Sequence, residues 1–232
     1  MITIRPSAER GSSKYNWLDS RHTFSFADYY DPKHMGFSEL RVINEDRVNP
    51  GAGFPAHSHR DMEIVTYVLE GALAHEDSMG TSSVIKTGEV QRMSAGTGIS
   101  HSEYNASQTE PVHFLQIWII PEESGLRPGY EQRSFDLRQK RGGWVLVAAT
   151  DARDGSMKIR QDTELFLASL PKAARLEYRF KPARQGWLQV TRGAAVLNGT
   201  SLAAGDGAAV SEEELLQIQS LDESEVLLFD LP

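Results

Sequence analysis

The sequence predicts an all-β fold, and three observations support that prediction. Short apolar or alternating runs recur along the 232 residues, and β-branched and aromatic residues are frequent in them. No stretch keeps a 3.6-residue period over four turns, which argues against long helices. Gly, Pro, Asn and Asp separate the runs at the short intervals typical of β-hairpins. We therefore expect barrels or sandwiches of many strands, with few short helices.

The strongest strand candidates are seven runs bounded by turn residues. In chain order they are Leu40–Ile43, Glu63–Leu69, Val112–Ile120, Trp144–Ala149, Glu164–Leu170, Trp187–Thr191 and Val226–Leu231. The matching turn signals lie at Gly71, 77–80, 87–88, 198–199 and 205–207.

The hairpin signals of the first half recur in the second. Residues 68–72 resemble 190–194, 80–82 resemble 199–201, and 87–89 resemble 204–206, with an offset that shrinks from 122 to 117 residues. The segment 121–143 between the halves is rich in charge and glycine and has no alternating apolar pattern. We therefore predict two domains, over residues 1–133 and 134–232.

Composition excludes several classes of site and partner. The chain has no cysteine, which excludes disulfides, thiolate catalysis, iron–sulfur clusters and Cys-type zinc sites. The formal net charge of −8 disfavours direct binding to nucleic acid. The N-terminus has no apolar run of signal-peptide length, and the apolar stretch 114–121 is too short to span a bilayer. We expect a cytoplasmic protein with no membrane partner, and a chain of this size needs no metal merely to fold.

The seven histidines all lie within the first 113 residues, and three of them form a pattern typical of metal ligands. His57 and His59 stand two residues apart, as do His101 and Glu103. Residues i and i+2 of a strand point to the same face, so each pair can converge on one point. Three neutral imidazoles and one carboxylate suit a divalent first-row metal with positions left for water, O2 or substrate.

The identity of the carboxylate ligand is open at this point. Glu63 has the same strand parity as His57 and His59, and a single β-bulge would reverse that parity. Glu63 and Glu103 therefore both remain candidates.

The other histidines are interpreted without a metal. We expect His22, His34 and His113 to be hydrogen-bonded within the barrel, and His75 to be a polar residue beside the turn at 77–80. Three apolar neighbours of the ligand candidates fit equally well in a pocket or in the core: Phe54, Met62 and Ile99.

The two clusters resemble the two motifs of the cupin superfamily. The first motif is matched by Gly51, His57, His59 and Glu63, with the closing Gly71 one residue late. The second is matched by Gly88, Gly98, His101 and Asn105, with Ser94 in place of the usual proline and two extra residues before Gly98. Within that superfamily the chain is similar to the pirin family, on residues 23–32, 55–60, 75–80 and 93–103. The match is dense in the first half, and it is closest to short bacterial members with quercetinase activity.

The resemblance implies a bicupin, in which two jelly-roll β-barrels face each other and only the N-terminal barrel holds a metal. In pirins the fourth ligand is the Glu two residues after the second-motif His. The implied ligands are therefore His57, His59, His101 and Glu103, with Glu63 in a supporting position. The corresponding positions of the second half carry Arg179 and the neighbourhood 217–219, with no histidine. We expect the C-terminal barrel to bind no metal.

The resemblance also implies an activity: quercetin 2,3-dioxygenase, which opens a flavonol ring with O2 and releases carbon monoxide. Glu103 is then expected to act as the base as well as a ligand. The expected metal is Fe(II), although the donor set would also hold Mn, Co, Ni, Cu or Zn. The expected partners are a flavonol-like small molecule and O2, with the protein itself a monomer.

Two other functions are compatible with the same resemblance. One is a pirin-like regulatory protein that senses redox state through its metal and acts on a protein partner. The other is an epimerase or isomerase, because cupins host many chemistries on one fold.

Overall fold

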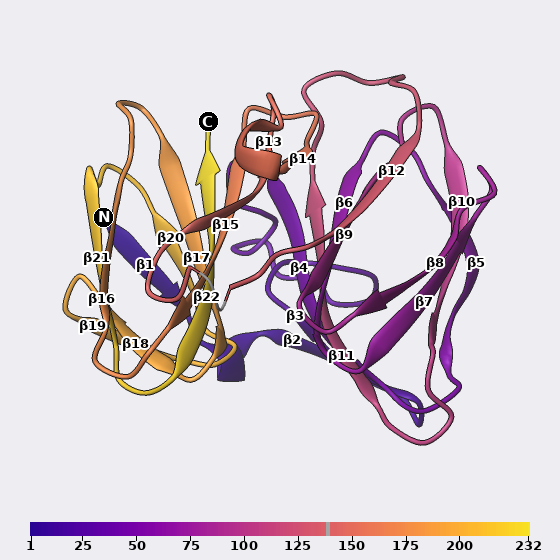
Figure 1. The fold of residues 1–232 in the computed structure, drawn as a ribbon, viewed down its shortest axis with the longest axis horizontal. Coiled ribbons are helices and arrows are strands. Elements are labelled where there is room, and N and C mark those ends of the chain that lie inside the picture. The colour runs from indigo at the N-terminus through magenta and orange to yellow at the C-terminus, as the bar shows by residue number, and fades with distance from the viewer. Residues whose placement is uncertain (138–139) are drawn as a thin grey trace. The chain divides into compact units, whose positions relative to one another are not determined.

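The computed structural model describes residues 1–137 and 140–232, which divide into two compact units (Figure 1). The N-terminal barrel comprises Gly11–Phe135 and Ile159–Gln161. The C-terminal barrel comprises Met1–Arg10, Asp136–Lys158 and Asp162–Pro232. Residues 138–139, within the predicted second domain, lie outside the described residues.

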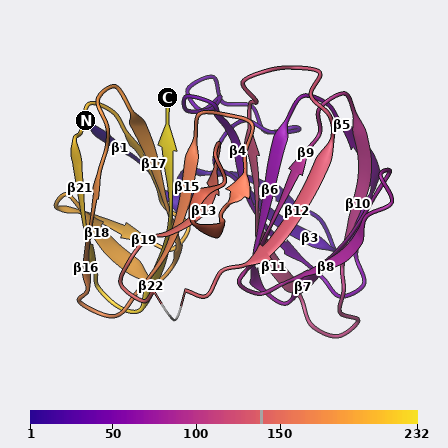
Figure 2. The same cartoon turned by 45° about the horizontal axis from the view of Figure 1, so that its top comes forward.

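The N-terminal barrel consists of two antiparallel sheets. Its strands are β2 (Gly11–Lys14), β3 (Leu18–His22), β4 (Leu40–Val48), β5 (Gly53–His59), β6 (Glu63–Glu70), β7 (Ala72–Asp77), β8 (Ser82–Lys86), β9 (Glu89–Ser94), β10 (Ile99–Asn105), β11 (Val112–Ile119) and β12 (Gly129–Ser134). The seven-stranded sheet has the order β12-β9-β6-β11-β4-β3-β2, and the four-stranded sheet has the order β5-β10-β7-β8. Figure 2 shows β12, β9 and β6 side by side in the larger sheet.

The C-terminal barrel contains the remaining strands and two short 3-10 helices. Its elements are β1 (Ile2–Arg5), η1 (Ser7–Glu9), β13 (Val145–Ala149), η2 (Arg153–Gly155), β14 (Met157–Lys158), β15 (Glu164–Leu170), β16 (Arg175–Arg179), β17 (Gln185–Arg192), β18 (Ala194–Leu197), β19 (Thr200–Ala203), β20 (Gly207–Val210), β21 (Leu215–Ser220) and β22 (Ser224–Leu231). Strand β1 pairs with β20, far along the sequence, which ties the first residues of the chain into this barrel (Figure 1).

The prediction of an all-β fold with few short helices is confirmed. Each of the seven predicted runs overlaps a strand, and Glu164–Leu170 coincides with β15. The repeat is also borne out by the topology. The sheet orders β9-β6-β11-β4 and β5-β10-β7-β8 recur as β20-β17-β22-β15 and β16-β21-β18-β19.

Apolar side chains from both sheets fill each barrel. In the N-terminal barrel, Val68 and Phe114 of the larger sheet pack with Leu73 and Ile85 of the smaller one, and all four are fully buried. Alternation along the strands supplies this inner face, because successive side chains point to opposite sides of a sheet.

The two barrels differ at the positions that matter for a metal. In the smaller sheet of the N-terminal barrel, Glu103 of β10 pairs with His75 of β7. In the smaller sheet of the C-terminal barrel, the corresponding pair is Ile218 of β21 and Leu197 of β18. Both apolar side chains are buried in the C-terminal core. Hydrocarbon therefore occupies the interior positions that carry ionisable groups in the N-terminal barrel.

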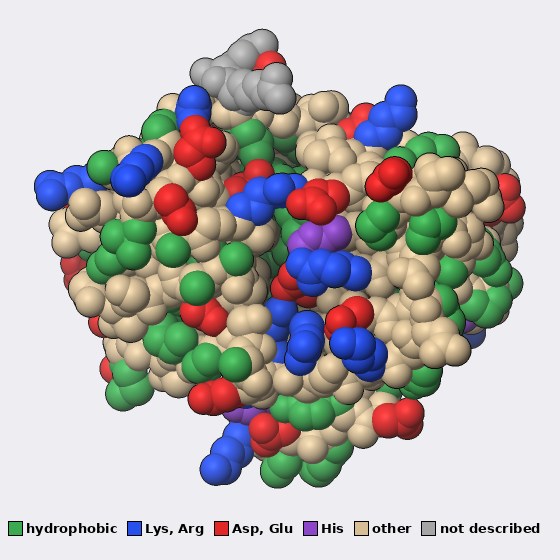
Figure 3. All heavy atoms as spheres, turned by 90° about the horizontal axis from the view of Figure 1, so that it is seen from below, with side chains coloured by type: hydrophobic (Ala, Val, Ile, Leu, Met, Phe, Trp, Pro, Cys, Tyr) green, Lys and Arg blue, Asp and Glu red, His purple; other side chains and the backbone are tan. Residues whose placement is uncertain are grey.

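The surface carries both basic and acidic side chains, as expected from a composition that has more acidic than basic residues. On the face shown in Figure 3, Lys and Arg side chains are interspersed with Asp and Glu side chains, and no uninterrupted basic surface is seen there. Among the described residues, neither 3-10 helix nor any other helix has the length and apolar character needed to cross a membrane.

Replacement of Ile218 by Ala tests whether the C-terminal barrel is held by this apolar interior. The side chain is 1% exposed, so its truncation should cost about 2–5 kcal/mol of unfolding free energy. Chemical denaturation measures the loss. The exposed neighbour Gln217→Ala serves as the control and should cost less than about 0.5 kcal/mol. Equal effects of the two variants would contradict the assigned core.

Candidate metal centre

The pairing of β5 with β10 brings the predicted ligands together. His57 lies directly opposite His101, and His59 lies opposite Ile99. The register shifts between His101 and Glu103, because β5 has two residues where β10 has one. This is the kind of irregularity that strand parity alone cannot predict.

The three imidazoles form one compact group. The ring centroid of His57 lies 4.4 Å from that of His101 and 4.8 Å from that of His59, and the His59–His101 centroid distance is 4.9 Å. The Nε2 atoms of His59 and His101 are 2.9 Å apart. Two imidazole nitrogens at that distance either share a proton or lie within reach of one cation.

Hydrogen bonds determine the tautomers of His57 and His101, and therefore which ring nitrogen carries the lone pair that can bind a metal. His57 Nδ1 donates to the carbonyl oxygen of Pro55 at 2.8 Å, because a carbonyl can only accept. The lone pair of the neutral ring is then on Nε2. A ligand histidine held in one tautomer by a backbone carbonyl is a recurrent feature of metal sites.

His101 is supported by His75, which is itself hydrogen-bonded to Asp77. His75 Nε2 donates to Asp77 Oδ2 at 3.2 Å, which leaves His75 Nδ1 as an acceptor. His101 Nδ1 faces that atom at 3.5 Å, so its proton is directed there and the lone pair is on Nε2. The expectation that His75 is a turn residue is therefore wrong: it lies within β7, is fully buried, and supports His101.

Glu103 is buried with one oxygen unpartnered. Its Oε2 accepts a hydrogen bond of 2.8 Å from Gln116 Nε2, and Gln116 Oε1 in turn accepts one of 2.9 Å from Thr66 Oγ1. Glu103 Oε1 has no hydrogen-bond partner among the described residues, although the side chain is only 2% exposed. An unsatisfied buried carboxylate oxygen is costly, and a metal ion would satisfy it.

Burial also shifts the proton equilibria of the group. Loss of hydration lowers the pKa of His59 to about 4, with a further contribution from His57. Loss of hydration, followed by the charges of the neighbouring histidines, lowers the pKa of His101 to about 2. Burial raises the pKa of Glu103 to about 7, and the negative charge of Asp46 acts in the same direction. The two imidazoles are therefore neutral at pH 7, as metal binding requires.

The ligand candidates fall into two overlapping groups. The first comprises His57, His59 and His101, and the second comprises His75, His101 and Glu103, each with its donor atoms within 4.8 Å of one another. His101 belongs to both. Glu103 thus lies on the His75 side of His101, and the four implied ligands do not form a single group at that distance.

The alternative carboxylate, Glu63, lies in a different environment. Its Oε2 accepts a hydrogen bond from the backbone N–H of Arg160 at 3.2 Å, and its side chain contacts that of Ser94. Glu63 belongs to neither group of potential metal ligands. His113 and His34 also lie outside both groups. Each contacts a carboxylate instead: His113 contacts Glu45, and His34 contacts Asp31.

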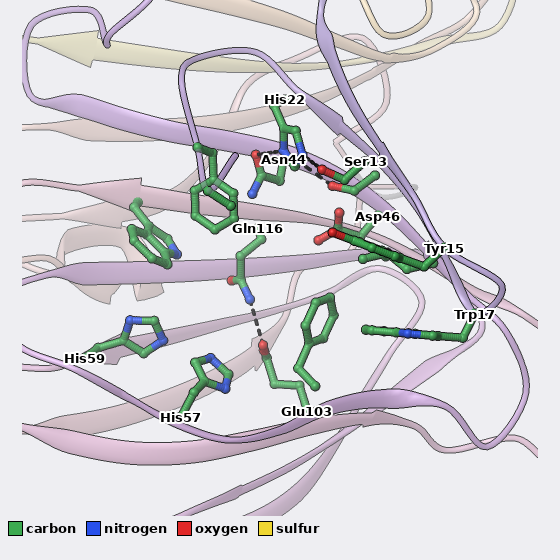
Figure 4. Close-up of a pocket in the computed structure, with 16 residues that line it drawn as sticks. Ser13, Tyr15, Trp17, His22, Asn44, Asp46, His57, His59, Glu103 and Gln116 are labelled. Carbon is green, nitrogen blue, oxygen red and sulfur yellow. Dashed lines mark hydrogen bonds between the residues drawn. The ribbon is translucent and has the colours of Figure 1, made fainter. Parts of the chain in front are cut away.

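A cavity of about 220 Å³ opens beside the histidines (Figure 4). In Figure 4, His57, His59 and Glu103 lie along one side, and Gln116 reaches across toward Glu103. Much of the remaining lining is aromatic, from Tyr15, Trp17, Phe26, Phe54 and Trp118. The cavity is therefore suited to a flat, largely apolar ligand that contacts the histidines at one end.

The apolar neighbours of the ligands divide between pocket and core. Phe54 lines the cavity, whereas Met62 and Ile99 pack with Ile64 and Met93. His22 also lines the cavity, which sequence reasoning had not indicated. No local motif marks His22 or Gln116, and the resemblance over residues 75–80 did not indicate a role for His75, because each reaches the site through long-range strand pairing.

The chain is similar to known proteins over its whole length. The model of the family described as Pirin matches residues 3–119, and the model described as Quercetinase C-terminal cupin domain matches residues 146–231. The quercetin 2,3-dioxygenase of Escherichia coli strain K12 is 53% identical over 232 residues, covering 100% of this chain and 99% of that protein. A pirin-like protein of Caulobacter vibrioides is 38% identical over 99% of both chains.

A solved structure is similar over the whole chain. It is that of the bacterial pirin YhhW from Escherichia coli in complex with nickel(II), which is 51% identical, with a TM-score of 0.96, and covers 100% of this chain and 99% of that one.

Replacement of His75 by Phe tests the support of His101. The variant keeps a ring in the buried space but removes the acceptor for His101 Nδ1. Metal affinity should fall about 10–100-fold, as is usual when a group that orients a ligand is lost. Competition with a chelator measures the affinity. Glu76→Gln, an exposed neighbour on the same strand, should leave it unchanged, and unaltered affinity of His75→Phe would contradict the role.

The stability of the metal-free protein should depend on the protonation of Glu103. Its pKa is raised from 4.5 to about 7, so the contribution is fully present below pH 4.5 and is lost as pH rises through about 7. The shift corresponds to about 3 kcal/mol. Metal-free Glu103→Gln should therefore be more stable than the metal-free parent at pH 8 and similar to it at pH 4. Denaturation at the two pH values measures this, and the opposite order at pH 8 would exclude the raised pKa.

Proposed function

The chain belongs to the pirin family of cupin proteins, and from that premise we propose that it is a metal-dependent quercetin 2,3-dioxygenase. The reaction opens the central ring of a flavonol with O2 and releases carbon monoxide. The observation that carries the proposal is the aromatic cavity bounded at one side by His57, His59 and Glu103. Full-length relatives named for this activity support it.

His57, His59, His101 and Glu103 are the proposed metal ligands. The donor atoms of the three histidines lie within 4.8 Å of one another, and Glu103 offers a carboxylate oxygen without a hydrogen-bond partner. Donors of these types suit a divalent first-row ion. When bound, such an ion supplies Lewis acidity, which favours the ionised form of a flavonol hydroxyl beside the carbonyl oxygen. Fe(II) remains the proposed native metal, and the same donors accept Mn, Co, Ni, Cu or Zn.

Glu103 is the proposed base. In the metal-free protein burial raises the pKa of its carboxyl to about 7, so a carboxylate released from the metal can take a proton near neutral pH. Gln116 holds Oε2 at 2.8 Å, so Oε1, the proposed metal-binding oxygen, would leave the metal to accept the proton of the flavonol 3-hydroxyl. Gln116, fixed in turn by Thr66, is a positioning residue for this step.

The other residues of the site bind the substrate or orient the ligand histidines. The aromatic walls exclude water from most of the cavity and favour a planar substrate. His57 and His101 keep their Nε2 lone pairs toward the centre, because Pro55 and His75 accept the protons on the opposite nitrogens.

The cavity also favours an enzyme over a purely regulatory protein. A redox sensor that acts through a protein partner needs a responsive surface near the metal. It does not need an aromatic pocket that leads to the ligands. Regulation through a partner therefore remains the second proposal, with less support from the site.

The proposed function is tested by reconstituting metal-free protein anaerobically with Fe(II), Mn(II), Co(II), Ni(II) or Cu(II). Quercetin and O2 are then added, and loss of flavonol absorbance and release of carbon monoxide are measured. Turnover with at least one metal, absent in His101→Ala, is the expected result. Stoichiometric metal binding without turnover would contradict the dioxygenase and favour the regulatory protein.

Glu103→Gln should lower kcat at least about 100-fold, because the amide cannot take the substrate proton. Glu63→Gln is the matched control: it replaces a second buried carboxyl of the same barrel and should retain most of the activity and all of the metal. Steady-state oxygen consumption with equal metal content measures both. If the Glu63 variant alone lost the metal, the two carboxylates would have to exchange roles.

A further inference from the structure

The cavity has a polar wall that the proposed chemistry does not use. Asn44, Asp46, His22 and Ser13 lie across the cavity from His57, His59 and Glu103 (Figure 4). These four side chains come from neighbouring strands of the larger sheet, β2, β3 and β4.

The strand register brings the polar groups to one place. His22 of β3 pairs with Asn44 of β4. Two residues before His22, Ser20 pairs with Ser13 of β2. Asn44 and Asp46 stand two residues apart on β4 and therefore point to the same face of the sheet. Both are nearly fully buried, with 3% and 4% of their surfaces exposed.

The orientation of the Asn44 amide is fixed from behind. His22 Nδ1 and Asn44 Oδ1 are 2.8 Å apart, and an amide oxygen can only accept, so the histidine donates. The neutral ring then accepts on Nε2 from Ser13 Oγ at 2.8 Å. With its oxygen held in this way, the Asn44 side chain turns its Nδ2 group toward the cavity, as Figure 4 shows.

This amide donor stands next to a carboxylate acceptor. Asn44 Nδ2 makes no hydrogen bond to another described residue, so it can donate to a ligand. Asp46 supplies a negative oxygen on the same wall. A phenolic hydroxyl, which accepts one hydrogen bond and donates another, matches this pair. A carboxylate at this end of the ligand does not, because Asp46 would repel it.

The adjoining wall selects for a flat ring. Trp17 packs edge to face with Phe54, with ring centroids 5.1 Å apart, and Tyr15 stacks on Trp17 at 6.5 Å. All three line the cavity, and Tyr15 is 56% exposed. The aromatic series thus runs from the surface of the N-terminal barrel into the cavity, beside the polar wall.

We propose that Asn44 is a specificity-determining residue that donates to a phenolic hydroxyl at the end of the substrate remote from the metal, with His22 as the residue that positions its amide. The proposal deepens the proposed function and rests on it. It assigns the substrate class as neutral, planar aromatics that carry a hydroxyl at each end, rather than aromatic acids or compounds with a hydroxyl only at the metal.

The test compares two flavonols in the parent protein and in Asn44→Leu. Quercetin carries remote hydroxyls, whereas 3-hydroxyflavone keeps only the 3-hydroxyl and the 4-carbonyl. Affinities are measured anaerobically on nickel-loaded protein by the change in flavonol absorbance. Asn44→Leu should weaken quercetin binding about five-fold, the value of one neutral hydrogen bond, and change 3-hydroxyflavone binding by less than about two-fold. Metal content is measured in parallel and should be unchanged.

Ser13→Ala is the second variant, in case the buried Asn44→Leu does not fold. It leaves Asn44 in place but removes the hydroxyl that sets the His22 tautomer. It should weaken quercetin and spare 3-hydroxyflavone in the same way, by a smaller factor. A loss confined to the hydroxylated ligand is a result that general damage to the pocket would not give.

Two results would overturn the proposal: equal losses for both ligands, or a parent protein that binds 3-hydroxyflavone as tightly as quercetin. Failure of the proposed function would be recognised separately. In that case the parent protein would bind quercetin but release no carbon monoxide on admission of O2, while the difference between the two ligands would still decide the role of Asn44.

Discussion

The pairing of β5 with β10 in a single register is the constraint on which the candidate centre depends. It places His57 opposite His101 and leaves His59 on the same face of the sheet. Because side chains alternate along a strand, a slip of one residue would turn one of the pairs away from the other. Pro55 and His75 then select the tautomers of two of the rings, so the same pairing also determines which nitrogen atoms face the centre.

The electrostatics of the three histidines and Glu103 favour the binding of a cation. Burial keeps His59 and His101 neutral, and it disfavours the charge on Glu103. In the proposed ligand assignment, a divalent ion would bind the three imidazole lone pairs and the unpartnered oxygen of Glu103. The C-terminal barrel has the same strand order but places Ile218 and Leu197 at the corresponding interior positions. One topology thus accommodates either a polar centre or a hydrocarbon core.

The features that could be predicted from sequence are those that depend on residues close together in the chain. Alternating runs indicated the strands, and the two i, i+2 pairs indicated the imidazole group. What could not be predicted arises from pairing between distant strands. His75 reaches His101 only because β7 lies beside β10. Gln116 reaches Glu103 only because β11, in the larger sheet, faces β10 of the smaller sheet. The assignment of Met1–Arg10 to the C-terminal barrel depends in the same way on β1 pairing with β20.

The position of the metal tests the account most directly, because two overlapping groups share His101. Anomalous diffraction from crystals of metal-loaded protein would locate the ion. The account predicts one peak about 2.0–2.2 Å from the Nε2 atoms of His57, His59 and His101, with Glu103 Oε1 as the fourth ligand. A peak bound by His75, or one beside Glu63, would contradict it.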